Sequence, residues 1–215
     1  MGKSGWIGFT CAVAGVVSSS VTALAGVSHA AEPGLQVVSD ATTYEQSAGG
    51  RSVVEDFTAA EHFPLLGCRL DAGTREQGLQ EGDIVPGVVF STHCSDPENF
   101  EFNIDAGSFQ GGYLDGFHHG ERTDRRALRV SFTEPVRAFG FDTNAHMGKA
   151  FKVRVLHTDG EVEVIDGLQV TAGYLGEQFY GFVSDTADIA RVRIAGRGDS
   201  TFGFALDDFR FTPAG

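Results

Sequence analysis

The stretch "FGFALDDFRF", residues 202–211, decides the fold of this chain. Large apolar residues alternate with smaller or polar ones, which is the period of a strand with one buried face. The large apolar residues up to Leu206 share one parity, whereas those from Phe209 onward share the other. The buried face therefore changes sides at Asp207-Asp208. An extra residue in one strand, a β-bulge, reorients side chains in this way, so the sequence predicts a bulge there.

The two carboxylates at this predicted bulge indicate a cation site. Asp207 has the parity of Phe209, so we expect it to face inward. A buried carboxylate without a partner costs several kcal/mol, so it needs a cation or backbone donors. Calcium suits a site rich in hard oxygen ligands, which makes Asp207 and Asp208 its predicted ligands. The alternative is an aspartate that only accepts hydrogen bonds from backbone amides of the turn.

The composition indicates an all-β protein. The 215 residues include 18 Phe and 29 Gly, against one Trp and two Met, and 41% are hydrophobic. Phe suits the half-buried face of a sheet, and Gly suits the turns between short strands. No window has sustained apolar spacing at three and four residues, so helices should be few and short. We predict an antiparallel β-sandwich of about ten strands.

Strand patterns follow one another along the chain. Residues 31–50 are interpreted as a lead-in strand followed by a turn, and residues 52–57 ("SVVEDF") as a strand. In the second half, "ALRVSFT" and "RAFGFDT" are expected to be separate strands joined by a turn at "TEP". Strand segments are further predicted in "GVVFST", "NFEFNI", "FKVRVL", "EVEVI", "QFYGFVS", "IARVRIA" and the closing stretch. No linker or fixed repeat is visible, which favours one domain over residues 31–215.

The segments "FKVRVL" and "EVEVI" flank "HTDG" and should form a hairpin. A two-residue Asp-Gly turn would place Leu156 opposite Glu163. A four-residue loop over 157–160 instead pairs Val155 with Val162, which joins apolar residues on one face. We therefore predict the four-residue loop.

The N-terminus has the pattern of a signal peptide. An uncharged apolar run follows Lys3, and "SHA" places small residues at Ser28 and Ala30, as a signal peptidase requires. We predict that residues 1–30 are removed, leaving no membrane span, and that the protein is secreted or periplasmic. A transmembrane anchor is the competing interpretation.

Charge and cysteine content fit an exported protein. Removing residues 1–30 takes away one lysine and changes the net charge from −13 to −14, which disfavours nucleic acid as a partner. It also leaves two cysteines, Cys68 and Cys94, which we predict to form a disulfide. The alternatives are two free thiols or, with less support from the spacing, a metal site.

Several motifs in the C-terminal half resemble a known type of bacterial exported domain. They are "VSFTEPVRAFGFD", "VRVLHTDGEVEV", "QFYGFVSDTADIARVRIAG" and "FALDDFRF", and "VVEDF" fits the opening strand. Together they resemble the β-sandwich domains of proteins sorted by a PEP-CTERM signal, which are similar in fold to jelly-roll carbohydrate-binding modules. In such modules acidic residues of the first strand join a closing-strand aspartate around a structural calcium. The resemblance therefore implies a jelly-roll-like fold, with Glu55 and Asp56 as further calcium ligands.

The Gly-rich excursion over residues 105–126 contains the side chains best suited to a ligand. Tyr113 and Phe117 could stack on a sugar ring, and His118 and His119 form the most catalytic-looking cluster. The plain alternatives are solvated loop histidines and aromatic rings that close one end of the sandwich. No G-x-S-x-G elbow or zinc-protease motif is present.

From these features we expect a secreted, non-catalytic β-sandwich that binds carbohydrate or another component of the envelope or extracellular space. A polysaccharide-acting enzyme, either a glycosidase or a lyase, is the alternative from a different class. A structural surface protein without a small ligand is the third.

Overall fold

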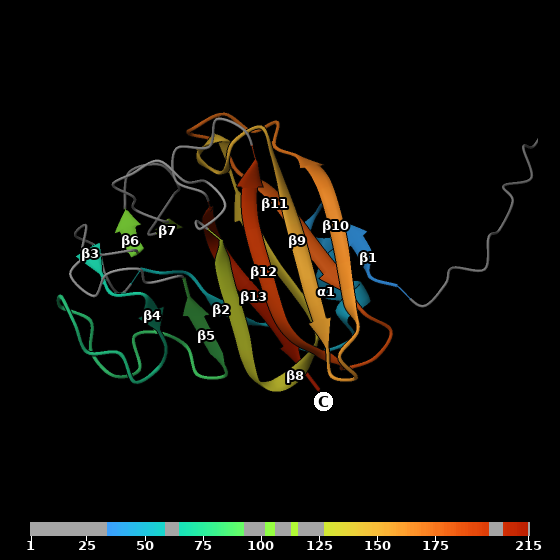
Figure 1. The fold of residues 1–215 in the computed structure, drawn as a ribbon, viewed down its shortest axis with the longest axis horizontal. Coiled ribbons are helices and arrows are strands. Elements are labelled where there is room, and N and C mark those ends of the chain that lie inside the picture. Colours follow the sequence, from blue (N-terminus) through green and yellow to red (C-terminus); the bar gives the residue numbers. More distant parts are fainter. Residues whose placement is uncertain are drawn as a thin grey trace, which may run out of the picture. The chain divides into compact units, whose positions relative to one another are not determined.

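The computed structural model describes residues 34–58, 65–92, 102–105, 113–115, 127–197 and 204–214. These residues belong to one compact unit, Glu32–Gly215. Every strand pairing among them is antiparallel, and α1 (Ala41–Ala48) is their one α-helix. The predicted all-β, sandwich-like fold is confirmed (Figure 1).

The described part of the chain contains thirteen strands and a 3-10 turn. The first seven strands are short: β1 (Gln36–Val38), β2 (Val53–Glu55), β3 (Leu65–Leu66), β4 (Arg69–Leu70), β5 (Val88–Ser91), β6 (Phe102–Asp105) and β7 (Tyr113–Asp115). The later elements are mostly longer: β8 (Leu128–Thr143), η2 (Ala145–Met147), β9 (Ala150–His157), β10 (Val162–Gln169), β11 (Gln178–Val183), β12 (Ile189–Arg197) and β13 (Ala205–Pro213).

The sixteen-residue strand β8 connects the two layers of the sandwich. Its first part pairs with β12 and β5, which gives a layer in the order β10-β9-β12-β8-β5-β4. Its second part pairs with β11 and β13, which gives the layer β1-β11-β8-β13-β2. The start of β13 also pairs with β7, which continues to β6 and β3.

The predicted turn at "TEP" is wrong, because the strand continues through it. Thr133, Glu134 and Pro135 lie within β8. The pairing of β12 along β8 shifts register in this region, between Ile189 and Arg191. A strand that changes its register and its partners can pass from one layer to the other without a turn.

Phenylalanine rings fill the space between the layers. Phe139 of β8 stacks on Phe182 of β11 with ring centroids 4.7 Å apart. Phe209 of β13 meets Phe90 of β5 edge to face at 5.2 Å. All four rings are fully buried; the first pair packs across neighbouring strands of one layer, and the second pair joins the two layers.

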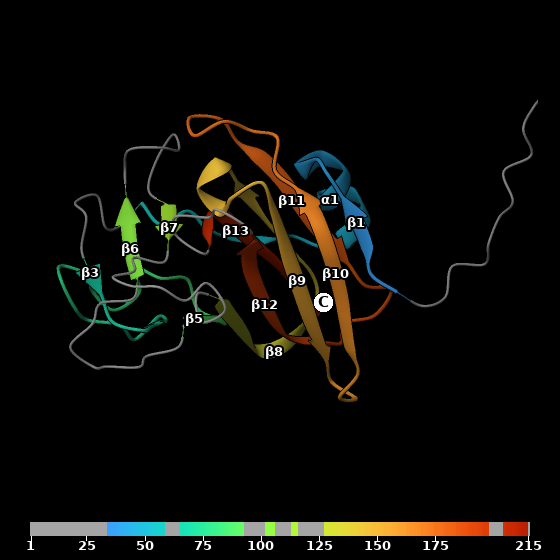
Figure 2. The same ribbon diagram turned by 45° about the horizontal axis from the view of Figure 1, so that its top comes forward.

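The helix α1 was not expected, since its segment was interpreted as a strand and a turn. It begins after Asp40, whose carboxylate accepts a hydrogen bond from the Thr43 amide at 2.7 Å. It ends at Gly49, which has the left-handed φ of 71°. These are the ordinary start and stop signals of a helix, and they are visible in the sequence. Figure 2 shows α1 beside β1 and β11, where Tyr44 packs against Phe179.

The predicted register of the β9–β10 hairpin is also wrong. Val162 pairs with Leu156 and Glu163 with Val155, because the loop has three residues, Thr158 to Gly160. Gly160 supplies the left-handed residue that such a loop requires, with φ 91°. A slip of one residue exchanges the two faces. Val162 is consequently exposed, and Glu163 points to the side that was assigned to the valines.

Candidate functional site

A β-bulge in β13 lies where the sequence predicts it. Asp207 pairs with Asp142 of β8, while Arg210 pairs with Gly140, so β13 has one extra residue in this interval. Asp208 lies within it and has a left-handed φ of 44°. The bulge allows residues on both sides of it, such as Leu206 and Phe209, to enter the same core.

The expectation that Asp207 faces inward is wrong. Antiparallel partners share a face of the sheet, and Asp142 alternates with Phe141, which is in the core. Asp207 therefore lies on the outer face of its layer, because the extra residue comes after it. It is nevertheless only 8% exposed, and its Oδ1 accepts a hydrogen bond from the Asp208 amide at 2.7 Å.

Four acidic side chains influence one another here: Asp142, Glu177, Asp207 and Asp208. The pKa of Asp207 is raised to about 8, chiefly by burial and also by the neighbouring carboxylates, against the lowering effect of the Asp208 amide. Burial likewise raises the pKa of Asp142 to about 6, against the lowering effect of Arg210. We call these four residues and Arg210 the closing-strand site.

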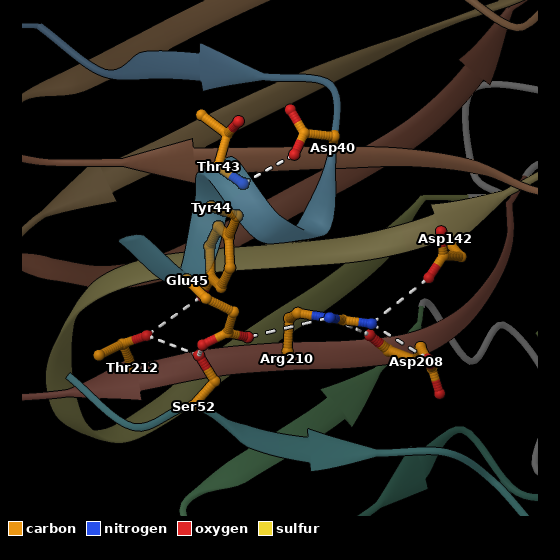
Figure 3. A network of polar contacts seen from close by, with 9 residues as sticks. All are labelled: Asp40, Thr43, Tyr44, Glu45, Ser52, Asp142, Asp208, Arg210 and Thr212. Carbon is orange, nitrogen blue, oxygen red and sulfur yellow. Dashed lines mark hydrogen bonds and ion pairs between the residues drawn. The ribbon is translucent and has the colours of Figure 1, made fainter. Parts of the chain in front are cut away.

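Arg210 connects the closing-strand site to α1, as Figure 3 shows. Its Nη2 lies 3.1 Å from the Asp208 carboxylate and 3.5 Å from that of Asp142, and its Nη1 lies 3.8 Å from that of Glu45. The guanidinium also stands 5.1 Å from the centre of the Phe179 ring. One cation thus faces several carboxylates, and the site as a whole remains negative.

The absence of a side chain at Gly140 makes this arrangement possible. A Cβ atom at Gly140 would lie 2.7 Å from Cζ of Phe179, which is closer than packed carbon atoms approach. The glycine therefore lets the Phe179 ring lie against the strand, beneath the Arg210 guanidinium. The glycine of "FGFD" is explained by this close packing.

An exposed aromatic ring lies at the same end of β8. Asn144 follows β8 directly and donates a hydrogen bond from Nδ2 to the Tyr174 carbonyl at 3.1 Å. The ring of Tyr174 meets that of His146 edge to face at 4.9 Å. Tyr174 is 59% exposed and Leu175 is 84% exposed, which makes them the most exposed large apolar residues in the described part of the chain. The exposed ring of Tyr174 thus lies at the end of β8 that carries Asp142 of the closing-strand site.

Glu55 and Asp56, the other predicted calcium ligands, are engaged elsewhere. Glu55 pairs with Phe209, and its two carboxylate oxygens accept hydrogen bonds from the amides of Phe57 at 2.8 Å and Val85 at 2.7 Å. Burial raises the pKa of Glu55 to about 7, and these two amides lower it. Asp56 is exposed and accepts hydrogen bonds from Thr58. The charges that act on Glu55 are those of Asp56 and Asp83, not those of the closing-strand site.

Other predicted residues lie partly outside the described residues. The backbone of Tyr113 lies in β7, one residue before Leu114, which pairs with Leu206. Phe117, His118 and His119 fall outside the described residues, and their predicted role stays a prediction. Cys68 lies between β3 and β4, whereas Cys94 falls outside, so their disulfide also stays a prediction.

Some residues of the closing-strand site were not predicted, although one of them has a local signal. Asp142 follows the core residue Phe141 and faces outward, opposite the predicted site residue, once β8 and β13 are paired. That pairing could not be derived from local patterns. No local pattern marks Arg210 or Glu177, and only the fold brings them to Asp142.

The chemistry of the site suits a hard cation, since its donors are carboxylate oxygens with raised pKa values. Within the described ranges, no three His, Cys, Asp or Glu side chains are already arranged to hold a metal ion. The same residues include no helix that is both long and apolar enough to cross a membrane.

Comparisons with known proteins give no family. No protein family and no curated protein match the sequence. Among solved structures, the chain is similar to the CBM32-1, CBM32-2 and M60 catalytic domains from Clostridium perfringens ZmpB. The sequence identity is 9% and the TM-score 0.34, over 86% of this chain and 17% of that one. A likeness this weak identifies neither a fold family nor a ligand.

Proposed function

We propose that this protein is an exported, non-catalytic β-sandwich that binds carbohydrate beside its closing-strand site. The observation that carries the proposal is the exposed ring of Tyr174 next to the polar end of β8. Aromatic rings offer a flat apolar face to a sugar ring. The carboxylates of Asp142 and Glu177 can accept hydrogen bonds from its hydroxyl groups.

A structural calcium ion completes the proposal. Asp207, Asp142 and Asp208 would hold the ion, which would take the place of the proton that burial keeps on Asp207 at moderate pH. Glu55 and Asp56 are less suited as ligands, because hydrogen bonds already occupy their carboxylates. The ion would supply fixed positive charge and hold the end of β13 in place.

Export is the second component of the proposed function. Removal of residues 1–30 as a signal peptide would deliver the chain to an oxidising compartment, where Cys68 and Cys94 can form a disulfide. Intact-mass measurement of exported protein, with and without reduction, tests both the cleavage and the disulfide. Retention of Met1 would contradict the cleavage, and two free thiols would contradict the disulfide.

Binding can be tested with the unmodified protein on a glycan array, followed by titration with the best ligand. Tyr174→Ala should weaken binding by about tenfold, roughly 1.4 kcal/mol. Val164→Ala removes another exposed apolar side chain, from β10, and should leave binding unchanged. An array without any ligand, or equal binding by Tyr174→Ala and the unmodified protein, would contradict the proposal.

An enzyme is the second candidate function, favoured by the different pKa values of Asp142 and Asp207. Two carboxyl groups whose pKa values are pushed apart are the usual acid and base of glycoside hydrolysis. Release of reducing ends from a bound polysaccharide, lost in Asp207→Asn, would establish the enzyme. Binding without release would establish the binding protein.

A further inference from the structure

A second polar region lies at the β9–β10 hairpin, away from the residues of the closing-strand site. A pocket of about 250 Å³ opens between this hairpin, residues 184–188 after β11, and Gly34 before β1. Strand pairing holds the two walls together. His157 pairs with Ile189, and the Thr158 amide donates a hydrogen bond to the Asp188 carbonyl at 2.8 Å.

The side chains that line this pocket are strongly acidic. Five carboxylic side chains line it with His157: Asp159, Glu161, Glu163, Asp185 and Asp188. No lysine or arginine is among its lining residues in the described part of the chain. A pocket with this lining concentrates negative potential, and it favours a positively charged occupant.

The histidine at the pocket wall is held between two carboxylates. Its Nδ1 lies 3.1 Å from Asp188 Oδ2, and its Nε2 lies 3.9 Å from Glu163 Oε2. Ser184 donates a hydrogen bond to the other Asp188 oxygen at 2.9 Å, which fixes that carboxylate. With 11% of its side chain exposed, His157 is a largely buried part of the pocket wall.

The carboxylates of the pocket differ in whether they already accept hydrogen bonds from the protein. Glu163 accepts hydrogen bonds from the Leu35 amide, and Asp159 accepts one from the Glu161 amide at 2.8 Å. No described residue donates a hydrogen bond to the carboxylates of Glu161 or Asp185, and neither forms an ion pair with one. They are therefore available to a ligand.

We propose that this pocket binds a primary ammonium group carried by a small ligand such as an amino sugar. The pocket volume accommodates a molecule of several atoms and not merely an ion. An ammonium group donates up to three hydrogen bonds and accepts none, so it matches acceptors that surround it without converging on one point. A bare metal ion needs converging ligands, and no such group is found among the described residues. The binding is independent of the proposed site at Tyr174.

The chain itself is a second source of the same chemical group. Gly34 lines the pocket, and the predicted signal-peptide cleavage leaves the α-amino group of Ala31 three residues before it. Three extended residues span roughly 10 Å, which is enough to reach across such a pocket. The protein beginning at Ala31 should therefore be compared with the same protein acetylated at its N-terminus.

Calorimetric titration with glucosamine, glucose and N-acetylglucosamine tests the proposal, because only glucosamine carries an ammonium group. Glucosamine should bind the acetylated protein, and the two neutral sugars should bind at least about tenfold more weakly. Binding to both forms would identify a free ligand, and competition by the unblocked N-terminus would identify the chain's own amine. Glucosamine binding no stronger than that of glucose to either form would overturn the proposal.

Variants distinguish the pocket from general surface charge. Glu161→Gln combined with Asp185→Asn should weaken glucosamine binding by about tenfold, because two unengaged acceptors lose their charge. Glu134→Gln, an exposed change of the same kind in β8, should have no effect. Tyr174→Ala should also leave glucosamine binding intact, so this proposal and the proposed carbohydrate site can fail separately. Equal weakening by Glu134→Gln would overturn the pocket assignment.

Discussion

Glu55 of β2 and Asp207 of the adjacent strand β13 are both buried carboxylates, and they differ in how many hydrogen bonds they receive. Glu55 accepts backbone amides on both oxygens, one from its own strand end and one from Val85, thirty residues away in the chain. Among the described residues, Asp207 accepts a hydrogen bond only from the amide of the next residue, and other carboxylates lie near it. A carboxylate satisfied on both oxygens serves the fold, whereas one left with acceptor capacity among like charges can serve a ligand.

The largest expected effect is that of Glu55→Gln. A glutamine has one acceptor oxygen, so its amide nitrogen would face a backbone N–H and leave that amide unsatisfied. We expect a loss of about 3 kcal/mol in the free energy of unfolding, measured by denaturant titration at pH 8, where Glu55 is mainly ionised. Asp56→Asn, next to it and exposed, should cost less than about 0.5 kcal/mol. If both variants were equally stable, Glu55 would not have the structural role assigned to it.

The second effect is a fall in stability as the pH rises in the presence of chelator. The folded-state pKa values of Asp142, Glu55 and Asp207 are raised to about 6, 7 and 8, so the folded protein binds more protons than the unfolded chain. Their contribution is complete below about pH 4 and is lost as the pH rises through these values. Unfolding free energies should therefore decrease steadily between pH 5 and 8.

The variant Asp207→Asn distinguishes the contribution of Asp207 from those of Asp142 and Glu55 in the same experiment. It removes the group with the highest pKa, so its stability should decline less steeply between pH 5 and 8. At pH 8 it should be nearly as stable as the unmodified protein, whereas Glu55→Gln should be clearly less stable. A stability that rises with pH in both proteins would contradict the raised pKa values.

A smaller effect is expected from Arg210→Gln. The substitution removes the contacts with Asp142, Asp208 and the Phe179 ring, and it takes away the charge that lowers the pKa of Asp142. We expect a loss of about 1–2 kcal/mol in thermal or denaturant unfolding, and a steeper decline with pH. Arg129→Gln, an exposed position of β8, should change neither by a measurable amount. Equal effects of the two arginine variants would show that Arg210 has no special role in the closing-strand site.

The sequence predicted the bulge and the two-layer fold because both follow from strand parity, which is a local property. It predicted neither the outward direction of Asp207 nor the register of the β9–β10 hairpin. Each depends on one residue of offset, and in the hairpin the three-residue loop with Gly160 at φ 91° sets a register that the apolar pattern alone did not favour. Asp142 and Arg210 could not be assigned to a site, since only the β8–β13 pairing brings them together.

The central claim is that Asp207 has acceptor capacity for a cation and Glu55 has not. Thermal unfolding in chelator and in millimolar calcium tests it most directly, on the unmodified protein and on Asp207→Asn, Asp208→Asn and Glu55→Gln. Calcium at one hundred times its dissociation constant should stabilise the unmodified protein by about 2.7 kcal/mol. Asp207→Asn should abolish this response, half-exposed Asp208→Asn should reduce it less, and Glu55→Gln should keep it from a lower melting temperature. An unmodified protein that melts at the same temperature in chelator and in calcium would contradict the claim.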